Sequence, residues 1–476
     1  MFIGILTLAA LLLGYKIYAP RLEKNWGVNI HRMASKRNFG LKPLNRRLAQ
    51  LSQLGVILSI NMLWGAIMGV VYGPLQMLWI VLGTLFFGAV INYYGGMYAL
   101  THDGHTLNYI LKEKHPRLHL TFGLLLILIM MFGVAGTLSI MYHVDYLVQN
   151  HSPIIYLYFG GMLFLSLCSH RKFRIFYMLF ALIVLAVSFY FVMYTAGEFQ
   201  FASLSLDLSQ YPELKFSYPL MFFVLAAGVM SGVDGFKCVL LAPSIKNEKT
   251  AKGIYFGAVV AQSVLMVLWA MILLAWNPEF AWLNKAMQRV TNPYELIQTR
   301  ILSHFNTVSA FVMYATACIL CIGGGGTMLR LTGVFAKELD VDKDVARDFV
   351  PLGCGLLAFG LYFLSALKFE NSDILMMIAN GAIRFVSTGV NCFDLLNMLM
   401  AGYVLGLLII YLREKKKRYM PYVYACFVIG GLCLAYVISL IIGWPFWLGT
   451  VAGLTVTLLS VGGWYFYPRW KERRQG

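Results

Sequence analysis

Apolar runs long enough to cross a bilayer follow one another along almost the whole chain. A spanning helix needs about 20 apolar residues, and 59% of the 476 residues are hydrophobic while only 12% are charged. Only helices and closed barrels satisfy their backbone polar groups in hydrocarbon, and a barrel would show short alternating segments instead. The pattern predicts an all-α polytopic membrane protein, in which the run Phe2–Leu13 is a retained helix and not a signal peptide.

Hydropathy predicts about thirteen transmembrane helices in a single membrane domain, residues 1–476, without a soluble domain or long linker. The eleventh is expected to have a re-entrant or broken start. The predicted spans are 2–19, 50–71, 74–100, 118–142, 153–169, 174–195, 217–242, 254–276, 306–330, 349–368, 374–412, 421–442 and 445–467.

The charges of the loops predict the orientation. The net charge is +17, and basic residues gather in the loops 21–47, 112–117, 171–174, 246–252 and 413–418 and in the tail 469–474, which share one side if the spans alternate. Cytoplasmic loops carry such an excess, so we expect the N-terminus outside, the C-terminus in the cytoplasm, and no nucleic-acid partner. The loop 331–348 has mixed charge. The segment 277–303 is interpreted either as an interfacial helix or as an ordinary structured loop.

Three spans combine glycines with polar residues in a way that predicts interruption. Glycine costs about 1 kcal/mol in a helix interior, so each site is either an unwound segment or a place of close helix packing. The residues concerned are Ser59 and Asn61 among Gly55, Gly65 and Gly69; Ser231 and Asp234 among Gly228, Gly232 and Gly235; and Thr327 and Arg330 after Gly323, Gly324, Gly325 and Gly326.

The directions of the spans suggest an internal symmetry. The second and seventh spans run oppositely through the membrane and are five helices apart. Inverted repeats of five helices place two broken helices in this relation, with the substrate bound between them. We therefore divide the chain into a first helix and basic loop (1–49), a first repeat (50–195), a second repeat (217–412), and two extra helices with a basic tail (421–476).

An acid and a base lie within the seventh span. If Asp234 is ionised it should pair with a cation, and the alternatives are Lys237, one helical turn away, and Arg330 from another helix. Lys237 alternatively extends toward the cytoplasmic interface, and a purely structural ion pair stays open. Further polar residues at or near membrane depth are Asn92, Asn380, Arg384, Asn391 and Asp394.

Two short motifs invite a chemical interpretation and favour a structural one. The run His102-Asp103-Gly104-His105 is interpreted as a hydrophilic turn and not as a metal site. Cys318 and Cys321 form a CxxC motif inside an apolar run, which favours helix-packing thiols. No familiar enzyme motif is present, so we expect neither catalytic activity nor a cofactor or metal.

Several segments resemble one family of transporters. The chain is similar to the carbon-starvation (CstA) family of bacterial inner-membrane proteins, over roughly its first three-fifths. The similar segments are Gly14–Tyr18, Leu22–Gly27, Leu78–Gly83, Phe86–Val90, Gly228–Gly232, Lys246–Lys249, Tyr255–Ala258 and Gly326–Arg330. The resemblance implies a LeuT-like core of two inverted five-helix repeats and uptake of peptides or small carboxylates such as pyruvate, driven by an ion gradient, with protons as the expected ion.

The chain departs from that family where its members carry titratable residues. Ile91-Asn92 stands in place of His-Asp, Val233-Asp234 in place of an aromatic residue and His, and Gly324–Gly326 in place of Ser-Gly-Asp. The family's FGHxF run and Gly-Pro pairs near the second span are also missing between 48 and 64. These replacements remove titratable groups, while Asp234 adds one.

Two hypotheses follow for function. The first is a secondary transporter whose substrate and ion pathway is lined or supported by Asn61, Asn92, Ser231, Asp234, Lys237, Thr327 and Arg330. In it, Arg330 and Lys237 meet a substrate carboxylate and Asp234 is the coupling acid. The second is a non-transporting relative that acts as a membrane sensor or partner subunit. Whether the chain forms a homo-oligomer is left open.

Overall fold

The computed structural model describes residues 2–28, 43–63, 66, 76–144, 154–195, 229–276, 307–366, 393–442 and 455. Within these ranges the elements are helices, and nine of them are long and apolar enough to cross a membrane. A shorter apolar helix, α9, spans Ile154–Leu167. Twelve of the thirteen predicted spans contain at least part of a described helix. The thirteenth, 445–467, lies outside the described residues except for Thr455.

The helices follow the predicted spans closely. In chain order the main elements are α1 (Phe2–Trp26), α2 (Arg46–Ile57), α4 (Gln76–Gly83), the π-helical η1 (Thr84–Gly88), α5 (Ala89–Thr101), η2 (Leu107–Tyr109), α6 (Ile110–Lys114), α7 (Pro116–Val144), α9, α10 (His170–Tyr194), α12 (Gly232–Lys237), η5 (Cys238–Leu240), η6 (Ala242–Ser244), η7 (Glu248–Thr250), η8 (Lys252–Phe256), α13 (Gly257–Trp276), α16 (Thr307–Glu338), η11 (Val345–Phe349), α17 (Val350–Ala366), α19 (Phe393–Glu414) and α20 (Met420–Ile442).

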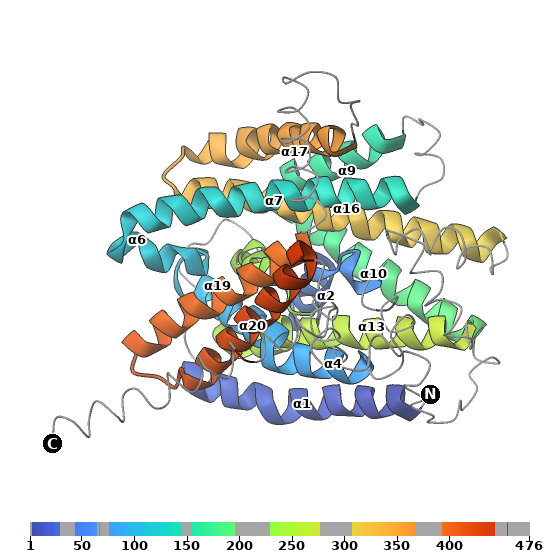
Figure 1. The fold of residues 1–476 in the computed structure, drawn as a ribbon, viewed down its shortest axis with the longest axis horizontal. Helices are drawn as coiled ribbons and strands as arrows, with labels where there is room; N and C mark the ends of the chain where they lie inside the picture. Colours follow the sequence, from blue (N-terminus) through green and yellow to red (C-terminus); the bar gives the residue numbers. More distant parts are fainter. Residues whose placement is uncertain are drawn as a thin grey trace.

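Two sets of packed helices organise the molecule. The α7 group consists of α7, α9, α16 and α17, which contact one another, and the α2 group consists of α2, α5, α12 and α13 with its preceding turn η8. In Figure 1 α7, α9, α16 and α17 run together along the top, while α13 lies below them with α4 and α1. The helix α10 contacts both groups through α2, α13 and α16.

The outer surface is apolar, as expected for a membrane protein. Leu157, Phe189 and Phe311 are each about 70% exposed (72%, 68% and 68%) and lie on different helices. Large exposed apolar areas are unusual on soluble monomers, whereas lipid tails accept them without cost. The protein is therefore a multi-pass membrane protein.

The predicted break at Gly323, Gly324, Gly325 and Gly326 is wrong. The helix α16 runs through all four glycines and continues past the predicted end at 330 to Glu338. The close-packing alternative is confirmed, because a Cβ on Gly325 would collide with Met162 and one on Gly326 with Leu165. The Tyr177 hydroxyl also donates a hydrogen bond of 2.8 Å to the Gly323 carbonyl. The glycines thus admit α9 and α10 against α16 instead of unwinding it.

Candidate functional site

The first helix break lies where the sequence predicts it, in the second span. The helix α2 ends at Ile57, Leu58 leaves helical geometry with φ −59° and ψ 129°, and helical structure resumes at Asn61. Ser59 is buried at the break and lies against Gly324 of α16. Asn61 is partly buried, between the fully buried Ile60 and Met62.

The second helix break lies just before α12. Val229 and Met230 are not helical, and Ser231 is the N-cap of α12, its hydroxyl accepting a hydrogen bond of 3.2 Å from the Asp234 amide. The side-chain oxygen of Asn397 on α19 accepts from the Ser231 hydroxyl at 3.2 Å and from the Val233 amide at 3.1 Å. Within the described part of this span, residues 229–231 are therefore not helical, and Asn397 holds the start of α12 in place.

The glycines around the second break have another role than the one predicted. Gly228 lies outside the described residues, while Gly232 and Gly235 lie inside α12 and not at the break. A Cβ on Gly232 would collide with the α19 backbone, and one on Gly235 would collide with Ile91 of α5. These two glycines therefore permit close helix contacts, and the break comes from the capped turn at Ser231.

Asp234 and Lys237 form a buried ion pair, which confirms the first of the two predicted partners. The Lys237 ammonium and the Asp234 carboxylate are 2.9 Å apart, and both side chains are buried. Lys237 therefore does not extend to an interface. Burying two charges is offset only when they are paired well, and this pair joins the two ends of the six-residue α12. The pairing leaves neither charge free to meet a substrate carboxylate.

A small polar network joins the two broken helices to α5. The Asn92 amide donates to the Gly88 carbonyl at 3.1 Å, and the Cys238 thiol donates to the Asn92 side-chain oxygen at 3.2 Å. The Gln53 amide of α2 reaches the Cys238 sulfur at 3.8 Å. Asn92 thus holds the segment that follows α12, and the predicted role of Asn92 in a substrate pathway stays a prediction.

Thr327 and Arg330 lie apart from this network. The Thr327 hydroxyl donates to the Gly324 carbonyl of its own helix at 2.7 Å. The Arg330 guanidinium donates to the Cys168 carbonyl at 2.8 Å and lies over the Phe173 ring, 4.3 Å from its centroid. The prediction that Arg330 joins Asp234 is wrong, because Arg330 is engaged by the carbonyls that follow the C-terminus of α9, where a cation is favoured.

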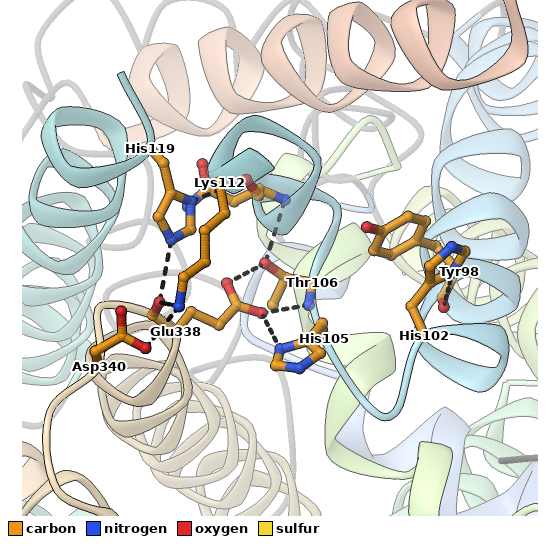
Figure 2. Close-up of polar contacts among 9 residues, drawn as sticks. Tyr98, His102, His105, Thr106, Lys112, His119, Glu338 and Asp340 are labelled. Atoms are coloured by element: carbon orange, nitrogen blue, oxygen red, sulfur yellow. Dashed lines mark hydrogen bonds and ion pairs between the residues drawn. The ribbon is translucent and has the colours of Figure 1, made fainter. Parts of the chain in front are cut away.

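The motif His102-Asp103-Gly104-His105 forms a turn at the end of α5, as predicted. Asp103 and Gly104 have positive φ angles of 52° and 77°. The described residues contain no group of three or more His, Cys, Asp or Glu side chains that could hold a metal ion. Figure 2 shows that His102 stacks on Tyr98 while His105 points instead toward Glu338 of α16.

The other predicted residues are placed as follows. Cys318 and Cys321 are buried thiols on α16, which confirms their packing role. Asp394 lies in the first turn of α19. Asn380, Arg384, Asn391, the start of the eleventh span and the segment 277–303 lie outside the described residues.

Three residues that link these helices were not predicted from the sequence. Asn397, Gln53 and Cys238 are buried and link different helices. Asn397 is an amide inside an apolar run, a pattern that marks it as a candidate in membrane helices. Gln53 and Cys238 lie near helix ends, where polar residues are common, so their types alone do not distinguish them.

Comparison with solved structures identifies the fold. A manganese transporter from Eremococcus coleocola aligns with a TM-score of 0.58 and 14% identity over 90% of this chain and 97% of that one. A Na⁺-coupled sialic acid symporter in a substrate-bound outward-open state aligns with a TM-score of 0.54 and 13% identity over 96% and 95%. The chain therefore has the LeuT-like fold of two inverted five-helix repeats, as predicted.

Sequence comparison is less specific. No family model matches the chain. A protein of Haemophilus influenzae described as an uncharacterized membrane protein is 27% identical over 336 residues, covering 56% of this chain and 90% of that protein. The chain is thus a multi-pass membrane protein with the fold of secondary transporters.

Proposed function

We propose that the protein is a secondary transporter that moves a small solute between the two helix breaks by alternating access. The observation that carries this proposal is the contact between α2, which is broken at Leu58–Ile60, and α12, which begins after the non-helical residues 229–231. They contact each other, and Gln53 and Cys238 connect them. In transporters built from inverted repeats, discontinuous helices at the repeat interface form the substrate site.

The two breaks differ in how many of their polar groups are already hydrogen-bonded within the protein. The polar groups at Ser231 are occupied by Asn397 and by the α12 backbone. Asn61 is accessible, and the Gln53 side-chain oxygen is buried without a hydrogen-bond partner among the described residues. A buried acceptor without a donor is costly. The first break therefore provides the recognition groups, and the second provides a fixed wall.

The substrate class we propose is a peptide or a small carboxylate such as pyruvate, taken up across the bacterial inner membrane with the C-terminus in the cytoplasm. The support is the similarity to the carbon-starvation family around Gly228–Gly232 and Gly326–Arg330. Because Lys237 and Arg330 are engaged by protein groups, a carboxylate would be recognised at the first break by the neutral N–H donors of the Asn61 amide, and the Gln53 oxygen would accept from a donor of a peptide substrate.

The direct test is uptake by the purified protein in proteoliposomes. Labelled dipeptides and labelled pyruvate are offered with and without an inward proton gradient. We expect accumulation above that of protein-free liposomes for one substrate class, increased by the gradient. Accumulation of neither class would contradict the substrate proposal, and flux that ignores the gradient would contradict proton coupling.

A non-transporting sensor or partner subunit is the second candidate. The observation that favours it is the composition of the breaks: between 53 and 63 and between 229 and 237 the only titratable residues are Asp234 and Lys237, which neutralise each other. Absence of flux for every substrate, together with co-purification of a signalling protein, would favour this role over transport.

A further inference from the structure

The segment 102–115 connects the two helix groups. It leaves α5 of the α2 group at the turn after Thr101 and enters α7 of the α7 group at Pro116. Any movement of one group against the other must therefore be absorbed within this connection. The contacts of residues 102–115 determine which of these residues move with the α2 group and which move with the α7 group.

A buried carboxylate at the end of α16 holds the middle of the connection. Glu338 is 2% exposed, and its two carboxylate oxygens accept hydrogen bonds from the Thr106 amide at 2.5 Å and the Thr106 hydroxyl at 2.7 Å. The His105 Nδ1 lies 3.7 Å from the same carboxylate. Hydrogen bonds to an ionised acceptor are about twice as strong as neutral ones. Glu338 thus ties Thr106 to α16 at two points (Figure 2).

A second set of contacts fixes the rest of the connection to the same place. The His119 ring of α7 lies 3.1 Å from the Glu338 carbonyl and 3.1 Å from the Asn108 carbonyl. The Lys112 ammonium donates to the Asp340 carboxylate at 2.6 Å. From Thr106 onward, the connection is therefore bound to the α7 group, with one further hydrogen bond to Asn108 from the Tyr403 hydroxyl of α19.

The turn before Thr106 is bonded to the end of α5 instead: the Gly104 amide donates to the Ala99 carbonyl at 2.8 Å, and the His105 amide donates to the His102 carbonyl at 2.9 Å. Asp103 is exposed, and its φ of 52° is held in the left-handed region. Gly104 has a φ of 77°, and a Cβ built on it would meet no atom within 4 Å. Hinges are short segments whose φ and ψ angles absorb a movement, and loose packing lowers the cost of such a change.

We propose that Glu338 is a positioning residue of the transport cycle: it clamps Thr106 to α16, so that α5 pivots relative to the α7 group at Asp103–Gly104. This role rests on the proposed alternating-access function. It assigns the clamp and the hinge to different residues of one connection. The clamp stays closed while the hinge turns.

Hydrogen exchange in lipid nanodiscs measures the clamp without any substrate. Replacing Glu338 with alanine should raise amide exchange in residues 105–112 about tenfold, the factor expected for losing a hydrogen bond to a charged group, and leave the interior of α7 protected. Thr106→Val should raise exchange in the same segment, while Thr106→Ser, which keeps the hydroxyl donor, should match wild type. Asp344→Asn is the matched control, because this exposed carboxylate pairs with Arg347 and not with the connection.

Distances between spin labels then test whether the clamp and the hinge are separate. Labels are attached to non-canonical residues at the exposed positions 114, 343 and 249, so that the eight native cysteines stay in place. The 114–343 distance should be narrowly distributed in wild type and broad in Glu338→Ala. The 114–249 distance, which spans the hinge, should be broad in both.

Unchanged exchange in 105–112 in both Glu338→Ala and Thr106→Val would overturn the proposal, as would a 114–343 distribution that stays narrow without Glu338. Both readings are independent of flux. If transport is absent while they behave as expected, the transport proposal fails and the clamp stands. If transport is present but the exchange and distance measurements differ from expectation, only the clamp proposal fails.

Discussion

At the scale of single residues, the buried polar groups of α12 and its N-terminal turn are paired with one another or with α19. Asp234 and Lys237 lie 2.9 Å apart in a region with almost no other charge. Ser231 and Asn397 supply the hydrogen bonds that a helix start lacks. In a low-dielectric interior, such groups are stabilising only as pairs. Removing one partner should therefore cost more than removing both.

The ion pair gives the first prediction. Asp234→Asn leaves Lys237 as an unpaired buried cation and should destabilise the protein by about 3–5 kcal/mol. The double variant Asp234→Asn with Lys237→Met removes both charges and should recover most of that loss. Thermal unfolding in detergent, followed by circular dichroism, makes the comparison. Equal losses in the single and double variants would show that the two charges do not stabilise each other.

The capped start of α12 gives the second prediction. Ser231→Ala removes the N-cap acceptor and should cost about 1 kcal/mol, whereas Ser231→Thr keeps the hydroxyl and should stay close to wild type. Asn397→Leu should cost more than Ser231→Ala, because it leaves two donors without their acceptor. The same unfolding experiment applies, and an Asn397→Leu protein as stable as wild type would contradict the assigned contacts.

At the scale of elements, glycine-rich runs have two outcomes in this fold. The run in α16 stays helical because α9 and α10 pack on it closely enough to exclude side chains. The second span, by contrast, breaks at Leu58–Ile60, between its glycines. Sequence patterns identified all three sites. Whether a glycine-rich run stays helical or unwinds depends on which helices pack against it, and the sequence of the run alone does not determine that.

This difference gives the third prediction, on paired glycines. Gly326→Ala places a Cβ against the Cβ of Leu165 and the Tyr177 hydroxyl and should destabilise the protein by about 1–3 kcal/mol. Gly353→Ala in α17 meets open space and should be neutral or stabilising by up to about 1 kcal/mol. The melting temperatures of the two variants, compared with that of wild type, test this prediction. A Gly326→Ala protein that is as stable as wild type, or more stable, would contradict the close packing of α16.

At the scale of the whole molecule, the helical spans could be predicted from the sequence, because span hydropathy follows directly from the bilayer, whereas the orientation predicted from loop charge stays a prediction. The pair Asp234–Lys237 was also predictable, since its members are one turn apart. The location of Arg330 was not, because it depends on where α9 ends relative to α16. Asn397 was missed for the same reason, since its partners are more than 160 residues away.

The central claim is that the first break faces a pathway that opens to both sides of the membrane. The most direct measurement is the reactivity of Asn61→Cys with a membrane-impermeant maleimide, in right-side-out and inside-out vesicles. Mass spectrometry of the peptide that contains position 61 separates it from native cysteines. Met62→Cys, at a buried position, is the control. The account predicts labelling at 61 from both sides and far slower labelling at 62. Labelling at 61 from one side only, or no faster than at 62, would contradict it.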